Sequence, residues 1–273
     1  MIIDTHSHLN FAAYKNDLDE VIKRTLDAGI FCINVGSKYE TSEEAVKIAE
    51  KYDGVYAAIG LHPIFAGAEF VKIKTDPEEG EFVVREQDFD IKKYKELSGS
   101  KKVVAIGEIG LDYYYRPKTK SKLEQFKEKQ KQVFLQQLDF AEELSLPAII
   151  HCRMAHDDVL EILKTKKVKG VIHCFTGKVK ELEQYLNLGF YIGFNGIIFK
   201  MDLDEAIKKC PLNKILVETD CPYLTPPAEG KDNRNEPIFV KHVIQKVADL
   251  KGLTFDQVAE ATTQNAKILF NFQ

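Results

Sequence analysis

Eight short apolar or β-branched runs are spaced along the chain, and they constrain its fold more than any other feature. The runs cover residues 2–5, 30–35, 55–59, 103–106, 148–150, 170–172, 190–193 and 214–217. Several are apolar throughout rather than alternating, which is the pattern of parallel strands that are covered on both faces. Segments of helical period lie between most of the runs, so strands and helices are expected to alternate.

Eight strands that alternate with helices in 273 residues predict an α/β fold, a (β/α)8 barrel of the TIM type. An open doubly wound sheet is the alternative arrangement. Barrels of this kind often occupy such a length as one domain. The chain has no internal repeat and no interdomain linker in its sequence, so we expect one barrel domain over residues 1–273.

Local signals mark the ends of some helices. Asp17 and Glu20 are spaced as a capping box before an apolar stripe, and Gly29 follows that stripe as a stop signal. Ser121 and Glu124 have the same spacing before a long segment of helical period. We therefore expect helices to begin at these two boxes.

One stretch departs from the simple alternation. Between His62 and Val103, two strand-like runs at 70–74 and 81–85 flank a turn that contains Pro77 and Gly80. This pattern predicts a β-hairpin inserted after strand three. Such a hairpin could help to hold substrate, or it could be a surface elaboration that makes no contact with substrate.

The charge balance limits the kind of partner that the chain can bind. Hydrophobic residues make up 44% of the sequence, which is enough for a sizeable core. The 38 Lys and Arg residues against 42 Asp and Glu residues give a net charge of −4, whereas proteins that coat nucleic acid with a broad basic surface are usually more positive. An anionic substrate would therefore need a local centre of attraction, such as a bound metal ion.

The sequence gives no indication of a membrane or secreted protein. No apolar stretch approaches the roughly 20 residues that span a bilayer, and the first residues run directly into the first strand. The five cysteines have no pairing framework and no CxxC spacing, so we expect reduced, mostly buried thiols and a cytoplasmic protein, or a nuclear one in a eukaryote. Strand alternation is expected to turn Cys152 and Cys174 away from the site.

Candidate metal ligands stand at the ends of five of the runs. His6 and His8 end the first run, and a strand places residues i and i+2 on one face. The candidates that close the fourth, fifth, sixth and eighth runs are Glu108, His151, His173 and Asp220. A single histidine at a strand end is more often a core residue than a ligand. However, barrel active sites form at the carboxyl ends of the strands, so these six side chains should meet at one mouth.

The donor set suits a pair of divalent ions. Histidines and carboxylates are the ligands that first-row divalent metals favour. We expect one ion on His6, His8 and Asp220, a second on His151 and His173, and Glu108 as a bridge between them. Two such ions about 3.5–4 Å apart polarise a phosphoryl oxygen and lower the pKa of bound water towards about 7, and the resulting hydroxide is the expected nucleophile.

Motifs along the whole chain resemble those of the TatD family of metal-dependent deoxyribonucleases, within the amidohydrolase-like barrels. The motifs are DTHSHL at 4–9, GLHP at 60–63, GEIGLDY at 107–113, IHCR at 150–153, HCFTG at 173–177, ETDCPYL at 218–224, RNEP at 234–237 and TTQNA at 262–266. The resemblance implies a TIM-type barrel, a divalent-metal centre and nuclease activity on DNA. It also implies metal ligands at the same six positions. The insertion between 62 and 103 is longer than the family's usual connection.

Further residues are expected to contact substrate, namely His62, Asp112, Tyr113 and Arg153. His62 could bind a phosphate or a metal-bound water, or it could stabilise its own turn. Arg153 could clamp a phosphate or form a buried ion pair. Tyr113 could stack on a terminal base, or Tyr113 to Tyr115 could be packing surface.

Other polar residues have weaker roles in this interpretation. Asp4 lies two residues before His6 and is expected to orient a ligand from deeper in the barrel. Asn195 and Arg234 are expected to approach substrate from later loops. His156 and His242 follow no strand and are expected to belong to helices.

We therefore predict a metal-dependent deoxyribonuclease that acts on DNA, with Glu108 and Asp220 as catalytic residues. Asp220 is expected to accept the proton of the attacking water. A pocket-shaped mouth and modest basicity favour trimming of strand ends, including single-stranded ends, over cutting within a duplex.

The main alternative is a small-molecule amidohydrolase or esterase that uses the same centre. Related barrels often carry a modified lysine at strand four, where this chain has Glu108. A catalytically silent binding protein would fit an incomplete ligand set, but this set is complete. Four histidines favour zinc or manganese, whereas substrate phosphate oxygens would suit magnesium. Oligomeric state cannot be deduced from these residues.

Overall fold

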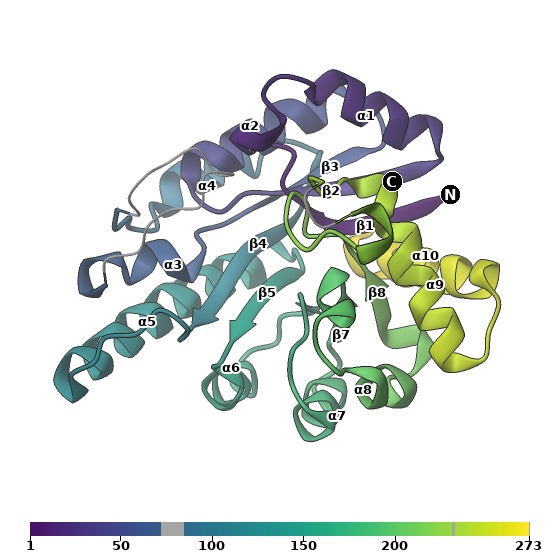
Figure 1. The fold of residues 1–273 in the computed structure, drawn as a ribbon. Coiled ribbons are helices and arrows are strands. Elements are labelled where there is room, and N and C mark those ends of the chain that lie inside the picture. The colour runs from purple at the N-terminus through teal and green to yellow at the C-terminus, as the bar shows by residue number, and fades with distance from the viewer. Residues whose placement is uncertain (72–84, 231–232, 273) are drawn as a thin grey trace.

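The computed structural model describes residues 1–71, 85–230 and 233–272, and their strands form one parallel sheet. The strands are hydrogen-bonded in the order in which they occur along the chain. They are β1 Ile2–Ser7, β2 Ile30–Val35, β3 Val55–Ile59, β4 Val103–Asp112, β5 Ala148–Arg153, β6 Gly170–Ile172, β7 Tyr191–Phe194 and β8 Ile215–Val217. With helices between them, they form the predicted TIM-type barrel (Figure 1).

Contacts just beyond the ladder close the barrel between its first and last strands. Ser7 pairs with Cys221 in an isolated parallel bridge. The Asp220 N–H donates to the carbonyl oxygen of His6 at 2.8 Å, and the His8 N–H donates to that of Cys221 at 2.8 Å. These bonds join the two ends of the chain's sheet into a nearly closed barrel and rule out the open doubly wound alternative.

Helices cover the outside of the barrel (Figure 1). They are α1 Leu18–Asp27, α2 Tyr39–Lys51, α3 Pro63–Ala66, α4 Ile91–Leu97, α5 Lys120–Leu144, α6 His156–Leu163, α7 Val179–Asn187, α8 Asp204–Lys209, α9 Val240–Lys251 and α10 Phe255–Phe270. The last turns of α10 pack against strand residues such as Ile3, Val104 and Leu216. The α10 side chain of Asn265 also donates to the carbonyl oxygen of Ile215, at the amino end of β8. The amino end of the barrel is therefore covered, and the carboxyl end is left for the site.

The predicted strands are present, but β4 is longer than its apolar run. The prediction ended at Ile106, because the glycines and Glu108 that follow interrupt the apolar pattern. In the structure β4 continues to Asp112, with a register shift against β5 between Ile106 and Ile109. Such an irregularity lets a strand continue through a polar residue and re-aim its side chain.

Neither predicted capping box forms. Asp17 precedes α1 but makes no hydrogen bond to the helix from its side chain, and it binds Arg234 instead. The helix α5 begins at Lys120, with Thr119 as its flanking residue, so Ser121 lies within the first turn. The stop at Gly29 is confirmed, because α1 ends at Asp27 and Gly29 has a φ of +72°.

The predicted hairpin lies for the most part outside the described residues, since 72–84 are not among them. On either side of that stretch, the structure describes α3, a 3-10 helix at Ala68–Phe70, and α4.

Within the described part of the chain, every helix is too short or too polar to cross a bilayer.

Gly110 should be the glycine of β4 that tolerates substitution least. Its φ is +143°, and a Cβ there would overlap the carbonyl oxygen of His151 on the neighbouring strand. We expect Gly110→Ala to lower the free energy of unfolding by about 2–4 kcal/mol, because strained backbone and overlap add together. Urea denaturation followed by circular dichroism measures this change.

Gly29→Ala is the matched control. Gly29 also has a positive φ, +72°, but a Cβ there would meet nothing within 4 Å. The expected loss is about 1 kcal/mol, from backbone conformation alone. Equal losses in the two variants would contradict the close approach of β4 and β5.

Candidate metal centre and active-site cavity

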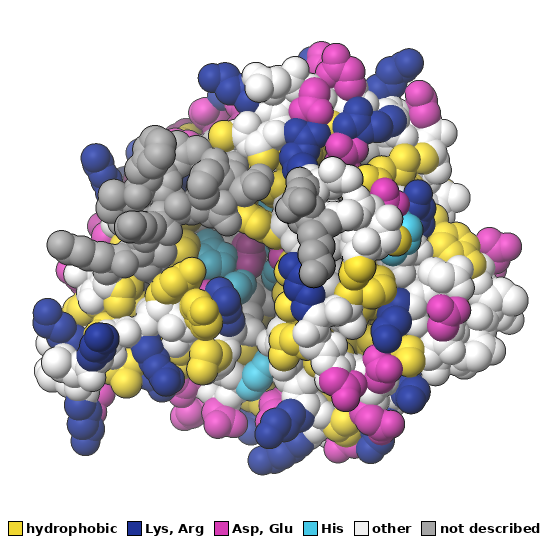
Figure 2. Space-filling view, viewed as in Figure 1, with side chains coloured by type: hydrophobic (Ala, Val, Ile, Leu, Met, Phe, Trp, Pro, Cys, Tyr) yellow, Lys and Arg dark blue, Asp and Glu magenta, His cyan; other side chains and the backbone are white. Residues whose placement is uncertain are grey.

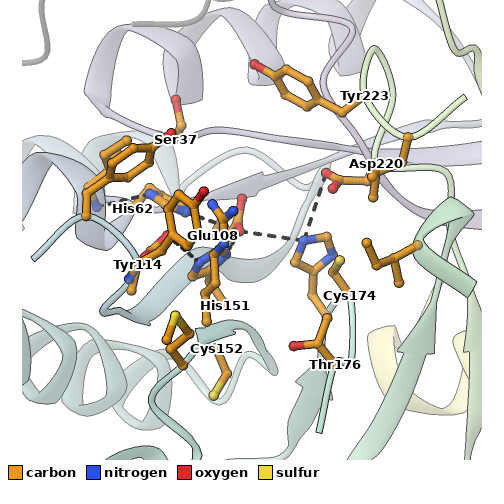
Figure 3. A pocket seen from close by; sticks show the side chains of 18 of the residues that line it. Ser37, His62, Glu108, Tyr114, His151, Cys152, Cys174, Thr176, Asp220 and Tyr223 are labelled. Carbon is orange, nitrogen blue, oxygen red and sulfur yellow. Dashed lines mark hydrogen bonds and ion pairs between the residues drawn. The ribbon is translucent and has the colours of Figure 1, made fainter. Parts of the chain in front are cut away.

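The six predicted ligands lie together at the carboxyl end of the barrel. Each comes from a strand or from the first three residues that follow it: His6 in β1 and His8 just after it, Glu108 in β4, His151 in β5, His173 after β6 and Asp220 after β8. Figure 3 shows Glu108 and His151 near the centre of the pocket, with Asp220 on one side and His62 on the other. The cavity has a volume of about 690 Å³.

One group of potential ligands lies where the barrel closes. The Nε2 atoms of His6 and His8 are 3.1 Å apart. The Oε2 atom of Glu108 lies 3.4 Å from His6 Nε2, and the Oδ1 atom of Asp220 lies 3.4 Å from His8 Nε2. Two ligands bound to one ion at about 2.1 Å, with angles near 90–110°, are separated by about 3.0–3.4 Å. These atoms therefore fit a single divalent ion.

A second group shares Glu108 with the first. Its Oε1 atom lies 2.7 Å from Nδ1 of His151 and 3.6 Å from Nε2 of His173. Glu108, His151 and His173 thus bring three potential ligand atoms close enough for one ion, as do His6, His8 and Glu108. The two oxygens of the Glu108 carboxylate face different groups, which is the arrangement of a bridging ligand.

Two of these histidines are oriented from the far side of their imidazoles, one by a hydrogen bond and the other by an ion-pair contact. The Nδ1 atom of His8 donates to the carbonyl oxygen of Val35 at 2.9 Å, which leaves Nε2 free to accept. The Nδ1 atom of His173 lies 2.8 Å from Oε1 of Glu218, a fully buried carboxylate. Such partners fix the tautomer and direction of metal-binding histidines. Glu218 was not among the predicted site residues, although it lies two residues before Asp220 in the ETDCPYL motif.

The buried carboxylates favour positively charged groups next to them. Burial opposes protonation of His151, but hydrogen bonds with Asp112 and Glu108 outweigh it and raise the pKa of His151 to about 9. Burial also opposes protonation of His173, but the charges of Glu218 and Asp220 raise its pKa to about 10. Burial favours the neutral form of Glu108, yet the surrounding histidines hold the pKa of its carboxyl well below the usual range. A divalent cation bound by neutral imidazoles would supply the same positive charge next to these carboxylates, so the residues fit a metal centre.

His62 and Asp112 border the second group. The Ile64 N–H donates to Nδ1 of His62 at 3.1 Å, so this imidazole does stabilise the start of α3. Its Nε2 atom lies 3.5 Å from Oε1 of Glu108. With Nδ1 accepting, the neutral ring carries its hydrogen on Nε2, which faces the site. Asp112 Oδ2 lies 3.1 Å from Nε2 of His151, so this carboxylate belongs to the ligand cluster as much as to the rim.

The structure corrects the expectation for Tyr113. Tyr113 is only 2% exposed, and its hydroxyl donates to Asp158, so its ring offers no face to a base. The next residue, Tyr114, is exposed and lines the cavity. Arg153 also lines the cavity, and its guanidinium stacks on Tyr114 rather than forming the buried ion pair considered above.

Two other residues expected near substrate have partners elsewhere. Arg234 donates to both carboxylate oxygens of Asp17 and to Glu236. Asn195 is fully buried, caps a 3-10 helix at Gly196–Phe199, and donates to Glu218. Neither lines the cavity. Both side chains support the loops around the site instead of facing it.

Asp4 links the backbone of β1 to the residues that follow β8, at the point where the barrel closes. Its carboxylate accepts from the Thr219 N–H at 2.9 Å, from the Thr219 hydroxyl at 2.6 Å and from the His6 N–H at 3.3 Å. Burial raises the pKa of Asp4 to about 8. Asp4 therefore lies behind the predicted ligands His6 and Asp220 and supports the backbone next to both.

None of the five cysteines forms a disulfide in the structure, and Cys174 is the one that is not buried. Both Cys152 and Cys174 border the cavity, but the Sγ atom of Cys152 lies 3.2 Å from Nδ1 of His156 in α6 and 3.6 Å from the hydroxyl of Tyr185 in α7. Cys152 lies within β5, where its thiol faces the helices as strand alternation predicts, whereas Cys174 lies beyond the end of β6, where regular alternation no longer applies. Burial raises the pKa of the Cys152 thiol to about 12, and it remains uncharged.

Comparison with known proteins agrees with this geometry. A family model described as "TatD related DNase" matches residues 3–271. The chain is 41% identical to the uncharacterized metal-dependent hydrolase YabD of Bacillus subtilis, over 99% of each protein. It is 31% identical to the 3'-5' ssDNA/RNA exonuclease TatD of Shigella flexneri, over 98% of each. The crystal structure of YjjV, a TatD homologue from Escherichia coli, superposes with a TM-score of 0.82 at 29% identity, covering 100% of this chain and 98% of that one.

Asn235 should be essential to the turn that carries Asp220. Its side-chain amide donates to the carbonyl oxygens of Thr219 at 3.0 Å and Tyr223 at 2.6 Å. We expect Asn235→Ala to lower the free energy of unfolding by about 2 kcal/mol, because two buried acceptors lose their donor. Asn213→Ala, at an exposed position, is the control and should change stability by less than about 0.5 kcal/mol. Similar values for the two variants in urea denaturation would refute this role.

Proposed function

This chain belongs to the family of TatD-related DNases and is a metal-dependent hydrolase, and from that premise we propose that it cleaves phosphodiester bonds at the ends of DNA strands. The observation that carries the proposal is the pair of ligand groups joined by Glu108 at the floor of an open cavity. A bridging carboxylate between two sets of histidines supports two ions per subunit rather than one.

The ligands would be divided between the ions as their distances suggest. His6, His8 and Asp220 would hold one ion, His151 and His173 would hold the other, and Glu108 would bind both. When bound, such ions polarise a phosphoryl oxygen and lower the pKa of water towards about 7. Zinc, manganese and magnesium are the candidate ions.

Other side chains would donate hydrogen bonds to the substrate's phosphate oxygens or accept a proton from the attacking water. The Nε2–H of His62 faces the site and can donate to a phosphate oxygen, because its Nδ1 is already used by Ile64. Asp220 is part of the ligand cluster and partly open to the cavity, so it can accept the proton that the attacking water loses. Arg153, at the exposed end of β5, can contact a further phosphate.

The shape and charge of the site favour strand ends. The cavity is bounded on one side by Tyr114 and on the other by Tyr223 (Figure 3), and the chain's net charge is −4. A pocket of this kind can admit the end of a strand, whereas cutting within a duplex calls for an extended basic groove. The relative named as a 3'-5' exonuclease on single-stranded DNA and RNA is consistent with this choice.

We expect Glu108→Gln to reduce hydrolysis of end-labelled single-stranded DNA by at least about 100-fold, because the variant loses the charge that is shared by both ligand groups. Chelation should abolish the activity of the wild type, and added zinc, manganese or magnesium should restore it. Gel analysis of the labelled products gives the rate and shows whether cleavage starts at an end.

Glu44→Gln, an exposed position on α2, serves as the matched control and should retain wild-type activity. Each protein is also tested on amide and ester substrates. Turnover of those substrates with none of DNA would favour the amidohydrolase alternative and refute the proposal. Equal DNA cleavage by wild type and Glu108→Gln would show that the activity comes from a contaminant.

A further inference from the structure

Two exposed tyrosines and an arginine form a stacked group at the rim of the cavity. Tyr114 is 51% exposed and Tyr115 is 42% exposed, and their rings meet edge to face with centroids 4.9 Å apart. The guanidinium carbon of Arg153 lies 3.7 Å from the centroid of the Tyr114 ring. Tyr114 keeps this exposure even though Arg153 covers part of it. We call these three residues, Tyr114, Tyr115 and Arg153, the aromatic platform.

The platform is attached directly to the metal centre. Asp112 accepts from the Tyr114 N–H through Oδ1 at 2.8 Å, and its Oδ2 lies 3.1 Å from Nε2 of His151. Arg153 is two residues beyond His151 on β5. All three platform residues line the same cavity as Glu108 and Asp220. A group held on the platform would therefore lie in the same cavity as the predicted metal ligands.

Arg153 differs from two other cations that cover tyrosine rings in this protein. Lys127 lies over Tyr113 and pairs with Asp158, and Arg234 lies over Tyr14 and pairs with Asp17. Among the described residues, Arg153 has no carboxylate within ion-pair distance. Its charge is thus not neutralised by the protein, which suits an anionic ligand.

Basic residues continue from the platform towards α5. They are all exposed and, within the part of the chain that the structure describes, they form no ion pair: Arg116, Lys118, Lys120 and Lys122. In contrast, Lys129 and Lys131, further along α5, are paired with carboxylates. Figure 2 shows hydrophobic and basic side chains next to the histidines at the hollow. These unpaired cations can bind the phosphates of a strand that leads away from the site.

We propose that the aromatic platform stacks an unpaired nucleobase next to the scissile phosphate, with the segment 116–122 contacting phosphates farther along the strand. The proposal rests on the proposed function and specifies its substrate as single-stranded nucleic acid. Aromatic rings and guanidinium planes stack on any base, but only when its face is not covered by a neighbour. A base inside a duplex has both faces covered, so the platform selects frayed or single-stranded ends.

An abasic scan tests the proposal. Short single-stranded DNAs are prepared with an abasic sugar at each terminal nucleotide in turn, and KM and kcat are measured for wild type, Tyr114→Ala and Tyr114→Phe. In the wild type, the missing base at one position should raise KM at least about five-fold, the lower limit for stacking of one base. Tyr114→Ala should raise KM by a similar factor on intact DNA, with no further rise when that one base is missing.

Tyr114→Phe keeps the ring and should behave as wild type. Tyr191→Ala is the control, because Tyr191 also lies under a cation, Lys214, but at the amino end of β7. It should leave the abasic profile unchanged. Thermal unfolding of each variant checks that the fold is kept.

Three results have distinct meanings. A wild-type profile without any sensitive position, or an equal effect of Tyr114→Ala on intact and abasic DNA, would overturn the stacking proposal while leaving the nuclease function intact. No cleavage of any DNA by the metal-loaded wild type would instead refute the proposed function itself.

Discussion

The Glu108 carboxylate is the interaction on which the arrangement of this site depends. It is buried and lies within 3.6 Å of nitrogen atoms from four histidines, on β1, β3, β5 and β6 or the residues just after them. A buried carboxylate is costly unless positive charge surrounds it. Four imidazoles, and the cations that they can bind, provide that charge. The chemistry of the mouth is therefore organised around one side chain of β4.

Closure of the barrel makes this arrangement possible. The first strand and the residue after it supply His6 and His8, and the residues after the last strand supply Asp220, so these predicted ligands meet only if the two ends of the sheet join. The hydrogen bonds between Asp220 and His6, and between Asp4 and Thr219, form that joint. Outside this joint, salt bridges connect the loop that contains Asn235 to α1. Arg24 pairs with Glu236, and Arg234 pairs with Asp17 and Glu236. Stability and the ligand geometry thus depend on the same contacts.

The strands of the barrel and the end at which the site lies were predictable from the sequence, because both are indicated by short local patterns. Apolar runs identify strands that are covered on both faces, and polar residues at their ends identify the mouth. Features that depend on distant partners were not predictable in the same way. Asp17 has the spacing of a helix cap, but Arg234, 217 residues away, binds its carboxylate instead. Likewise, the choice between Tyr113 and Tyr114 as the exposed ring depends on Asp158 in α6, which binds the hydroxyl of Tyr113.

The number of divalent ions bound per chain tests the central claim most directly. Calorimetric titration of metal-free protein with manganese, together with elemental analysis after dialysis, measures this number without reference to any substrate. We predict two ions per chain in the wild type and a loss of at least one in Glu108→Gln, whose side chain can no longer serve both groups as a carboxylate. A wild type that binds no ion, or a variant that binds two ions as tightly as the wild type, would contradict the account.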